Sequence, residues 1–194
     1  MCAQALAALV VLLTFPAPAI TLGVASLGLV AVYPFAKRFT WWPQAFLGLA
    51  FNWGALLAWT AHAGGLGLPA LLLYAAGVAW TLFYDTIYAH QDRDDDALIG
   101  VRSTARLFGA RTHAWLSGFL AAAATLAASA ILAAVPPGPG LWLALAGAAG
   151  FTLHLGRQLR RLDVDDAAGC LRLFRSNRDA GLILAVGLAA AALA

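Results

Sequence analysis

The charged residues of this chain are confined to a few short stretches, and this distribution constrains the fold more than any other feature. All twelve lysines and arginines lie within residues 37–38, 93–111 and 157–178. The segments between them are apolar, and each is long enough, or nearly so, to cross a hydrocarbon core of ~30 Å as a helix. Helices are required because an open strand would leave backbone groups unpaired in lipid. The pattern predicts an all-α, polytopic transmembrane helix bundle embedded in a lipid bilayer.

Composition excludes several other classes of protein. Only 11% of the residues are charged and 62% are hydrophobic, whereas an ordinary soluble domain carries roughly 25% charged residues. A water-soluble globule could not cover its surface with so few charges. Cys2 and Cys170 are too few and too far apart for a disulfide framework or a metal cluster. The net charge of +3 comes from connecting segments and not from a basic face, so we expect no nucleic-acid partner.

The apolar segments predict about seven helices, separated by proline and glycine. They cover residues 2–15, 20–35, 44–62, 68–91, 112–135, 141–156 and 179–194. The cationic residues all fall in the connections after the second, fourth and sixth helices. The positive-inside rule therefore predicts a multi-pass protein whose charged connections are cytoplasmic. Alanine richness with a single lysine suggests a high-GC bacterial source, which would make the membrane a bacterial inner membrane.

Acidic residues are concentrated at the end of the fourth predicted helix. If that helix continues, Asp92 and Asp96 lie about 20° to either side of Asp85, with Tyr88 beside this stripe and Asp95 on its flank. Stacked carboxylates repel one another unless a cation lies among them. Mg²⁺ is the natural cation, because it typically uses one or two carboxylates together with substrate phosphate oxygens. The pattern predicts a Mg²⁺ site that holds a diphosphate.

A solvated acidic loop at the membrane surface is the simpler alternative. It accounts for Asp94, but it does not account for Asp85, which lies two turns inside the apolar pattern. An acidic residue in that position is costly and is a functional candidate. Arg38 and Arg102 could hold a diphosphate or a carboxylate bidentately. Arg106, Arg111 and the Arg157–Arg161 group are expected only to anchor the protein at the membrane surface.

Two stretches of the chain resemble UbiA-type membrane prenyltransferases, and most closely their 4-hydroxybenzoate polyprenyltransferase branch. The first comprises Tyr33-Pro34-Phe35-Ala36-Lys37-Arg38, Pro43-Gln44 and Phe51-Asn52-Trp53-Gly54. The second, similar to the second Asp-rich motif of the family, comprises Tyr84-Asp85-Thr86-x-Tyr88-Ala89-x-x-Asp92-x-x-Asp95-Asp96 and Gly100-x-x-Ser103-Thr104. The later Cys170-Leu171-x-x-Phe174-x-x-Asn177 also resembles that branch. The resemblance covers nearly the whole chain.

The resemblance implies a bundle of nine helices around a cavity open to lipid. Two Asp-rich motifs would hold Mg²⁺ and a polyprenyl diphosphate, and an aromatic acceptor such as 4-hydroxybenzoate would capture the prenyl cation, as in ubiquinone biosynthesis. By motif position, the metal ligands would be Asp92 and Asp96, the catalytic residues Asp85 and Tyr88, and the substrate-binding residues Lys37, Arg38, Asp95 and Arg102.

The chain departs from the family pattern in one respect. The first Asp-rich motif, of the form Asn-Asp-x-x-Asp-x-x-x-Asp, is absent, and no aspartate precedes Asp85. We therefore expect residues 1–194 to be a single transmembrane prenyltransferase domain that lacks two N-terminal helices. The missing N-terminal half could be supplied by a separate partner. We expect this polypeptide by itself to have little or no activity.

Three alternatives stay open at the level of the sequence. Within the same reaction class, the acceptor could be a naphthoate or a haem. Outside it, an intramembrane acidic residue such as Asp85 could serve a small transporter, although the chain shows neither paired halves nor broken helices typical of one. The missing motif also permits a non-catalytic membrane scaffold.

Overall fold

The structure is a computed structural model, and it describes residues 2–194. Its regular secondary structure in that range is entirely helical, which confirms the predicted all-α class. The α-helices are α1 (Cys2–Leu13), α2 (Ala17–Val32), α3 (Ala36–Phe39), α4 (Pro43–Phe51), α5 (Trp53–Ala63), α6 (Leu68–Ala89), α7 (Arg93–Leu98), α8 (Thr104–Phe108), α9 (Thr112–Ala134), α10 (Pro139–Arg161) and α11 (Ala167–Ala192). Two single 3₁₀ turns, Tyr33–Phe35 and Gly109–Arg111, join neighbouring helices.

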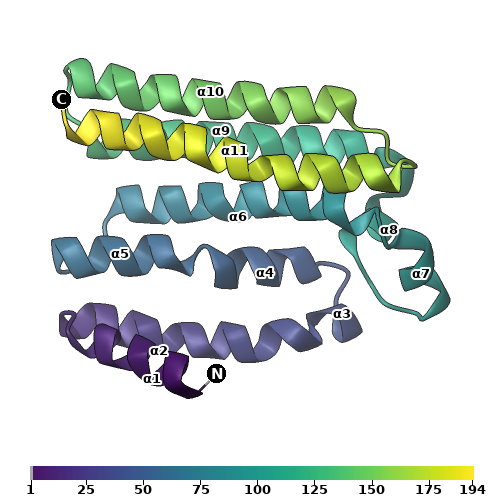
Figure 1. The fold of residues 1–194 in the computed structure, drawn as a ribbon, viewed down its shortest axis with the longest axis horizontal. Coiled ribbons are helices and arrows are strands. Elements are labelled where there is room, and N and C mark those ends of the chain that lie inside the picture. The colour runs from purple at the N-terminus through teal and green to yellow at the C-terminus, as the bar shows by residue number, and fades with distance from the viewer. Residues whose placement is uncertain (1) are drawn as a thin grey trace.

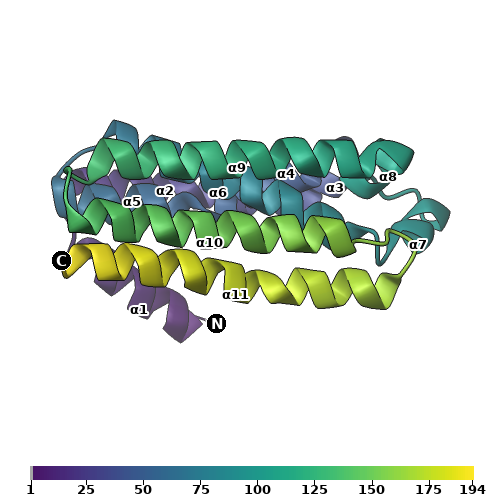
Figure 2. The same cartoon turned by 90° about the horizontal axis from the view of Figure 1, so that it is seen from above.

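The long helices lie side by side with their axes roughly parallel (Figures 1 and 2). Helix α6 is central and packs against α9, α4 and α11, while α10 packs against α11 and α9. Helices α1 and α2 form one edge of the bundle. The short helices α3, α7 and α8 gather at one end (Figure 1). Most charged residues lie at this end, so the bundle has one charged end and one apolar end.

Membrane-type helices are present as predicted. Three segments are long and apolar enough to cross a membrane, namely Ala17–Phe39, Leu68–Ala89 and Thr104–Ala134. A shorter apolar helix covers Ala3–Leu13. The buried core that joins the central helices contains Phe83 and Ile87 of α6 and Leu116 of α9, packed against side chains of α10 and α11.

The single helix predicted over residues 44–62 is interrupted, and this prediction was wrong in that respect. Asn52 separates α4 from α5. Its side-chain amide donates hydrogen bonds to the Gly48 carbonyl and to the Thr81 hydroxyl, each over 2.8 Å. A Cβ on Gly77 would lie 2.3 Å from Asn52 Oδ1. The break therefore depends on a polar contact with α6 that only a glycine at position 77 leaves room for.

The last two helices are longer than the predicted 141–156 and 179–194. Helix α10 continues through its arginines to Arg161, and α11 begins at Ala167, twelve residues before the predicted start. Asp166 caps α11 by accepting a hydrogen bond from the Gly169 amide over 2.8 Å, and it pairs with Arg172 over 3.2 Å. The stretch predicted to be a charged loop is thus mostly helical, because its charges cap and extend the two helices at the membrane surface.

Cys170 is fully buried where α11 meets the core. Burial raises the pKa of its thiol to about 11. A thiol reagent reacts with the thiolate, so labelling of Cys170 reports unfolding of the charged end of α11.

Candidate active site

The acidic residues do not lie on one continuous helix, which corrects the predicted stripe. Helix α6 ends at Ala89, a turn follows, and α7 begins at Arg93. Buried His90 makes a 3.1 Å hydrogen bond between its Nε2 and the Thr112 hydroxyl of α9. Asp92 has φ −108° and ψ 11°, outside the helical range. The turn changes the direction of the chain after α6. The carboxylates of the Asp-rich segment are therefore positioned by tertiary contacts and not by helical spacing.

Four of these carboxylates have no partner in the part of the chain that the structure describes. In the hydrogen bonds and ion pairs formed among residues 2–194, the side chains of Asp85, Asp92, Asp95 and Asp96 do not take part. Asp94 differs, because it is exposed and pairs with Arg93 over 3.2 Å. Unpaired carboxylates near one another are unfavourable unless a cation is bound, so the arrangement can accept positive charge.

The carboxyl groups of Asp96 and Asp85 both interact with the charge of Lys37. Asp96 is only 7% exposed. Burial raises the pKa of its carboxyl, and positively charged Lys37 opposes this effect, while Asp92 and Asp95 reinforce it. The charge of Lys37 also interacts with that of Asp85. The fold therefore brings together most of the residues predicted from the Asp-rich motif and joins them to the Lys37 segment.

Backbone hydrogen bonds hold the Asp-rich segment in place. The Asp96 amide donates to the Asp92 carbonyl over 2.8 Å, and the Val101 amide donates to the Asp96 carbonyl over 2.9 Å. The Arg106 guanidinium donates to the carbonyls of Asp96 and Val101 and lies over the Trp41 ring. Sequence reasoning assigned Arg106 only to membrane anchoring. No spacing pattern marks its role, since its partners are backbone oxygens.

The other predicted cations differ in their surroundings. Arg38 is exposed on α3 and lies 5.8 Å from the Phe35 ring centroid. Arg102 donates to the Phe39 carbonyl over 2.8 Å, and its own amide donates to the Lys37 carbonyl over 3.3 Å. Arg102 therefore ties the Asp-rich connection to the Lys37 segment. Its predicted role in diphosphate binding, like that of Arg38, stays a prediction.

Aromatic side chains of α6 and α11 form a wall that includes Tyr84, the residue before Asp85. The Tyr88 ring centroid lies 4.5 Å from that of Phe174, and Tyr84 lies 5.8 Å from the same ring. Trp80 packs edge-on against Tyr84 and donates its indole N–H to Asn177 Oδ1 over 2.9 Å. Such rings exclude water, and their faces attract a positive charge. Helix α11 thus contributes to the wall through residues whose role the spacing alone did not reveal.

A buried polar cluster connects the Asp-rich connection to α4 and α6. Gln44 Oε1 accepts a hydrogen bond from the Thr104 amide over 3.2 Å, and the Thr104 and Thr86 hydroxyls lie 2.7 Å apart. All three side chains are almost fully buried. This cluster fixes the start of α8 against α4 and α6, and so it fixes where the connection between α6 and α9 ends.

Replacing Gln44 with Leu should destabilise the fold by about 1–3 kcal/mol, because it leaves the buried Thr104 amide without an acceptor. Thermal unfolding in detergent, followed by Cys170 labelling in a Cys2→Ser background, measures the effect. Gln4→Leu on exposed α1 is the control and should leave the unfolding midpoint nearly unchanged. Equal midpoints for Gln44→Leu and the parent would contradict the proposed importance of this hydrogen bond.

Carboxylates of the acidic site have the chemistry that a divalent metal ion with oxygen ligands requires. Within the described residues 2–194, no three His, Cys, Asp or Glu side chains are grouped closely enough to hold a metal ion. Mg²⁺ commonly binds through one or two carboxylates together with substrate phosphates. Buried, unpaired Asp96 and neighbouring Asp92 fit that requirement. The site residues alone can thus supply part of a metal and diphosphate site.

The sequence of this chain matches a known family and several known proteins. Residues 1–193 match the UbiA prenyltransferase family. The chain is 49% identical over 187 residues to the mitochondrial 4-hydroxybenzoate polyprenyltransferase of Drosophila melanogaster, covering 96% of this chain and 47% of that protein. It is 48% identical to the mouse protein of the same name, covering 93% of this chain and 48% of that one. The chain therefore spans about half the length of these relatives.

A solved structure shares the fold. The apo structure of a UbiA homolog from Aeropyrum pernix K1 superposes with a TM-score of 0.73 at 23% identity, covering 92% of this chain and 66% of that one. The arrangement of helices seen here is thus the arrangement found in that protein.

Proposed function

Because this chain belongs to the UbiA prenyltransferase family, we propose that it carries the second Asp-rich half of an active site that transfers a polyprenyl group to 4-hydroxybenzoate. The supporting observation is the set of four unpaired carboxylates at the charged end of the bundle, with Asp96 buried among them. The relatives that bear the 4-hydroxybenzoate polyprenyltransferase name support this acceptor over a naphthoate or a haem. Family membership likewise favours an enzyme over a transporter.

The site residues have different proposed roles. Asp92 and Asp96 would hold Mg²⁺, and Asp95 would contribute to substrate binding. When bound there, the metal would supply positive charge that offsets the charge of the departing diphosphate. Lys37 and Arg38 add positive charge at the same end of the bundle for the departing diphosphate. Arg102 holds their segment in place through its hydrogen bonds to the Phe39 and Lys37 carbonyls.

Asp85 and Tyr88 line the reacting centre, where the aromatic wall keeps water from the prenyl cation. The ring carbon ortho to the acceptor hydroxyl then forms the new C–C bond, and that carbon loses its proton.

The membrane orientation follows from the charges. The positive-inside rule is the only support for the predicted orientation, in which the charged end with the Asp-rich segment faces the cytoplasm, and this orientation stays a prediction. The predicted bacterial inner membrane finds no support among the relatives named above, which are mitochondrial proteins. A mitochondrial membrane is therefore the compartment that we propose.

Activity should require the missing motif. The purified chain, given Mg²⁺, a polyprenyl diphosphate and 4-hydroxybenzoate, should form almost no prenylated product, because half of the diphosphate ligands are absent. Co-expression with a family segment that carries the first Asp-rich motif should produce prenylated 4-hydroxybenzoate, detected by mass spectrometry. Product that depends on the added segment, and is lost with Tyr88→Ala, supports the proposal. Absence of product from a folded, assembled complex would favour a non-catalytic scaffold instead.

A further inference from the structure

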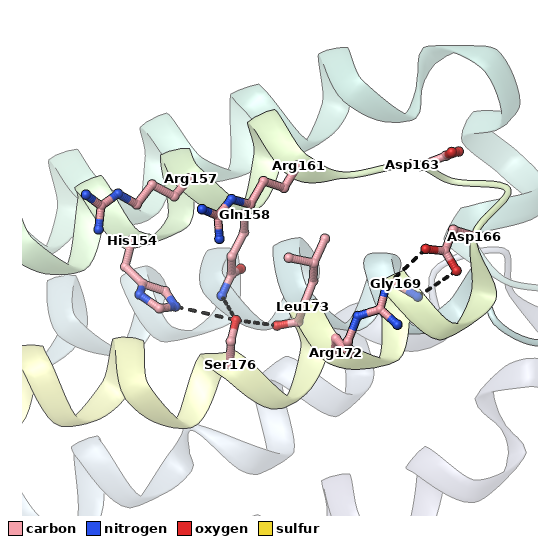
Figure 3. A pocket seen from close by; sticks show the side chains of 10 residues that line it. All are labelled: His154, Arg157, Gln158, Arg161, Asp163, Asp166, Gly169, Arg172, Leu173 and Ser176. Carbon is pink, nitrogen blue, oxygen red and sulfur yellow. Dashed lines mark hydrogen bonds and ion pairs between the residues drawn. The ribbon is translucent and has the colours of Figure 1, made fainter.

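A groove separate from the acidic site lies between the charged ends of α10 and α11. It has a volume of about 440 Å³. Figure 3 shows Arg157 and Arg161 on the α10 side and Arg172 and Ser176 on the α11 side, with Gln158 reaching between the helices. The face of α11 that carries Phe174 packs toward α6, so this groove opens away from the aromatic wall.

The arginines of α10 give the groove unneutralised positive charge. Arg157 and Arg161 are one helical turn apart and exposed, and neither forms an ion pair within the described part of the chain. Like charges at this spacing repel one another. Arg172 is already paired with Asp166 over 3.2 Å. Asp163 also lines the groove, so three arginines face two aspartates. The excess charge is positive and is concentrated on α10.

The floor of the groove contains a buried polar atom without a partner. Gln158 is only 3% exposed, and its Nε2 donates to the Ser176 hydroxyl over 2.8 Å. Ser176 donates in turn to the Leu173 carbonyl over 2.8 Å. Gln158 Oε1 has no hydrogen-bond partner among residues 2–194. A buried acceptor without a partner is unfavourable, so a ligand that donates a hydrogen bond there would be stabilised.

These features define the chemistry of a ligand. Two adjacent guanidinium groups suit a phosphate, which arginine can bind bidentately. The unpartnered acceptor Gln158 Oε1 suits a hydroxyl group in the same headgroup as that phosphate. The groove lies at the same end of the bundle as α7 and α8 (Figure 1), where the charged residues mark the membrane surface. Basic pockets between transmembrane helices at this level bind phospholipid headgroups.

We propose that the α10–α11 groove binds the phosphate of an anionic phospholipid whose headgroup carries hydroxyl groups, with Arg157 and Arg161 on the phosphate and Gln158 Oε1 on a headgroup hydroxyl. The site is independent of the prenyl-transfer reaction. Phosphatidylglycerol fits both requirements. Phosphatidylcholine has the phosphate but fits less well, because its quaternary ammonium adds positive charge beside the arginines and donates no N–H or O–H hydrogen bond.

Native mass spectrometry of the full chain, delipidated and then given one lipid, tests this proposal. The parent protein should retain one phosphatidylglycerol and bind phosphatidylcholine at least ~10-fold more weakly. The double variant Arg157→Gln/Arg161→Gln should lose about 10-fold in phosphatidylglycerol binding. The matched control Arg160→Gln/Arg175→Gln removes two exposed arginines outside the groove and should bind as the parent does. Protection of Cys170 from labelling verifies that each variant is folded.

Further arms distinguish the possible outcomes. Arg157→Lys/Arg161→Lys keeps the charge and should retain part of the binding, which also keeps the test informative if the glutamine variant does not fold. Gln158→Leu should weaken phosphatidylglycerol binding. Equal loss in the groove variant and its control would overturn the proposal, because the attraction would then be a diffuse surface effect. Displacement of the lipid by low millimolar inorganic phosphate would also overturn it, since the site would then recognise free phosphate.

Discussion

Asp96→Asn should weaken metal-dependent binding of a prenyl diphosphate by about 100-fold, or ~3 kcal/mol at 1.4 kcal/mol per tenfold change. The substitution preserves the shape of the side chain but removes its charge. Asp96 is buried and unpaired, and its backbone is held by the Asp92 carbonyl and the Val101 amide. The protein therefore cannot easily move another carboxylate into its place.

Electron paramagnetic resonance of bound Mn²⁺, in the presence of geranyl diphosphate, measures this effect without requiring catalysis. Asp94→Asn is the matched control, because Asp94 belongs to the same short helix but is exposed and paired with Arg93. It should change binding by less than about twofold, as expected for an exposed ion pair. Similar losses in both variants would mean that net charge, and not a defined site, attracts the metal. Undiminished binding by Asp96→Asn would remove this residue from the proposed ligand set.

Gly187→Leu should separate α10 from α11 and destabilise the bundle by about 3 kcal/mol, the upper end of the usual cost of overpacking. A Cβ on Gly187 would lie 2.6 Å from the Cα of Gly147, and a Cβ on Gly147 would lie 2.8 Å from the Cα of Gly187. Neither backbone can give way without opening the whole interface. Small residues commonly allow transmembrane helices to approach in this manner.

The midpoint of thermal unfolding, measured by Cys170 labelling in a Cys2→Ser background, should fall by roughly 6–12 °C. Gly118→Leu in α9 is the control, because a Cβ at Gly118 meets no atom within 4 Å. It should leave the midpoint within a few degrees of the parent value. If the two leucine variants unfold at the same temperature, the close approach of α10 and α11 does not contribute to stability as described.

Hydropathy and charge predicted the main helices because burial in lipid selects residues by type. The apolar segments that became α1, α2, α6 and α9 had the right lengths and nearly the right ends. The same reasoning failed at Asn52, where one polar contact to Thr81 interrupts an otherwise apolar helix. It also failed at α10 and α11, since charged residues there extend helices instead of ending them.

The sequence predicts which residues belong to the candidate site, but it does not predict how they are arranged. An aspartate inside an apolar helix is costly, so Asp85 stood out without any structure. The turn at His90 depends on a hydrogen bond to Thr112, 22 residues away. Arg106 acts through carbonyl groups, which every residue carries, so no sequence pattern indicates its contacts.

The sequence by itself determined that this chain is helical and membrane-embedded, and that its acidic and basic groups lie at one end. Those properties follow from the free energy of transferring each side chain between water and lipid, which is local information. Only the tertiary structure decided how those groups meet. Lys37 lies near enough to Asp85 and Asp96 for their charges to interact, Phe174 of α11 packs against Tyr84 and Tyr88, and α10 with α11 forms a basic groove. These contacts join residues far apart in the chain, and packing between helices specifies them.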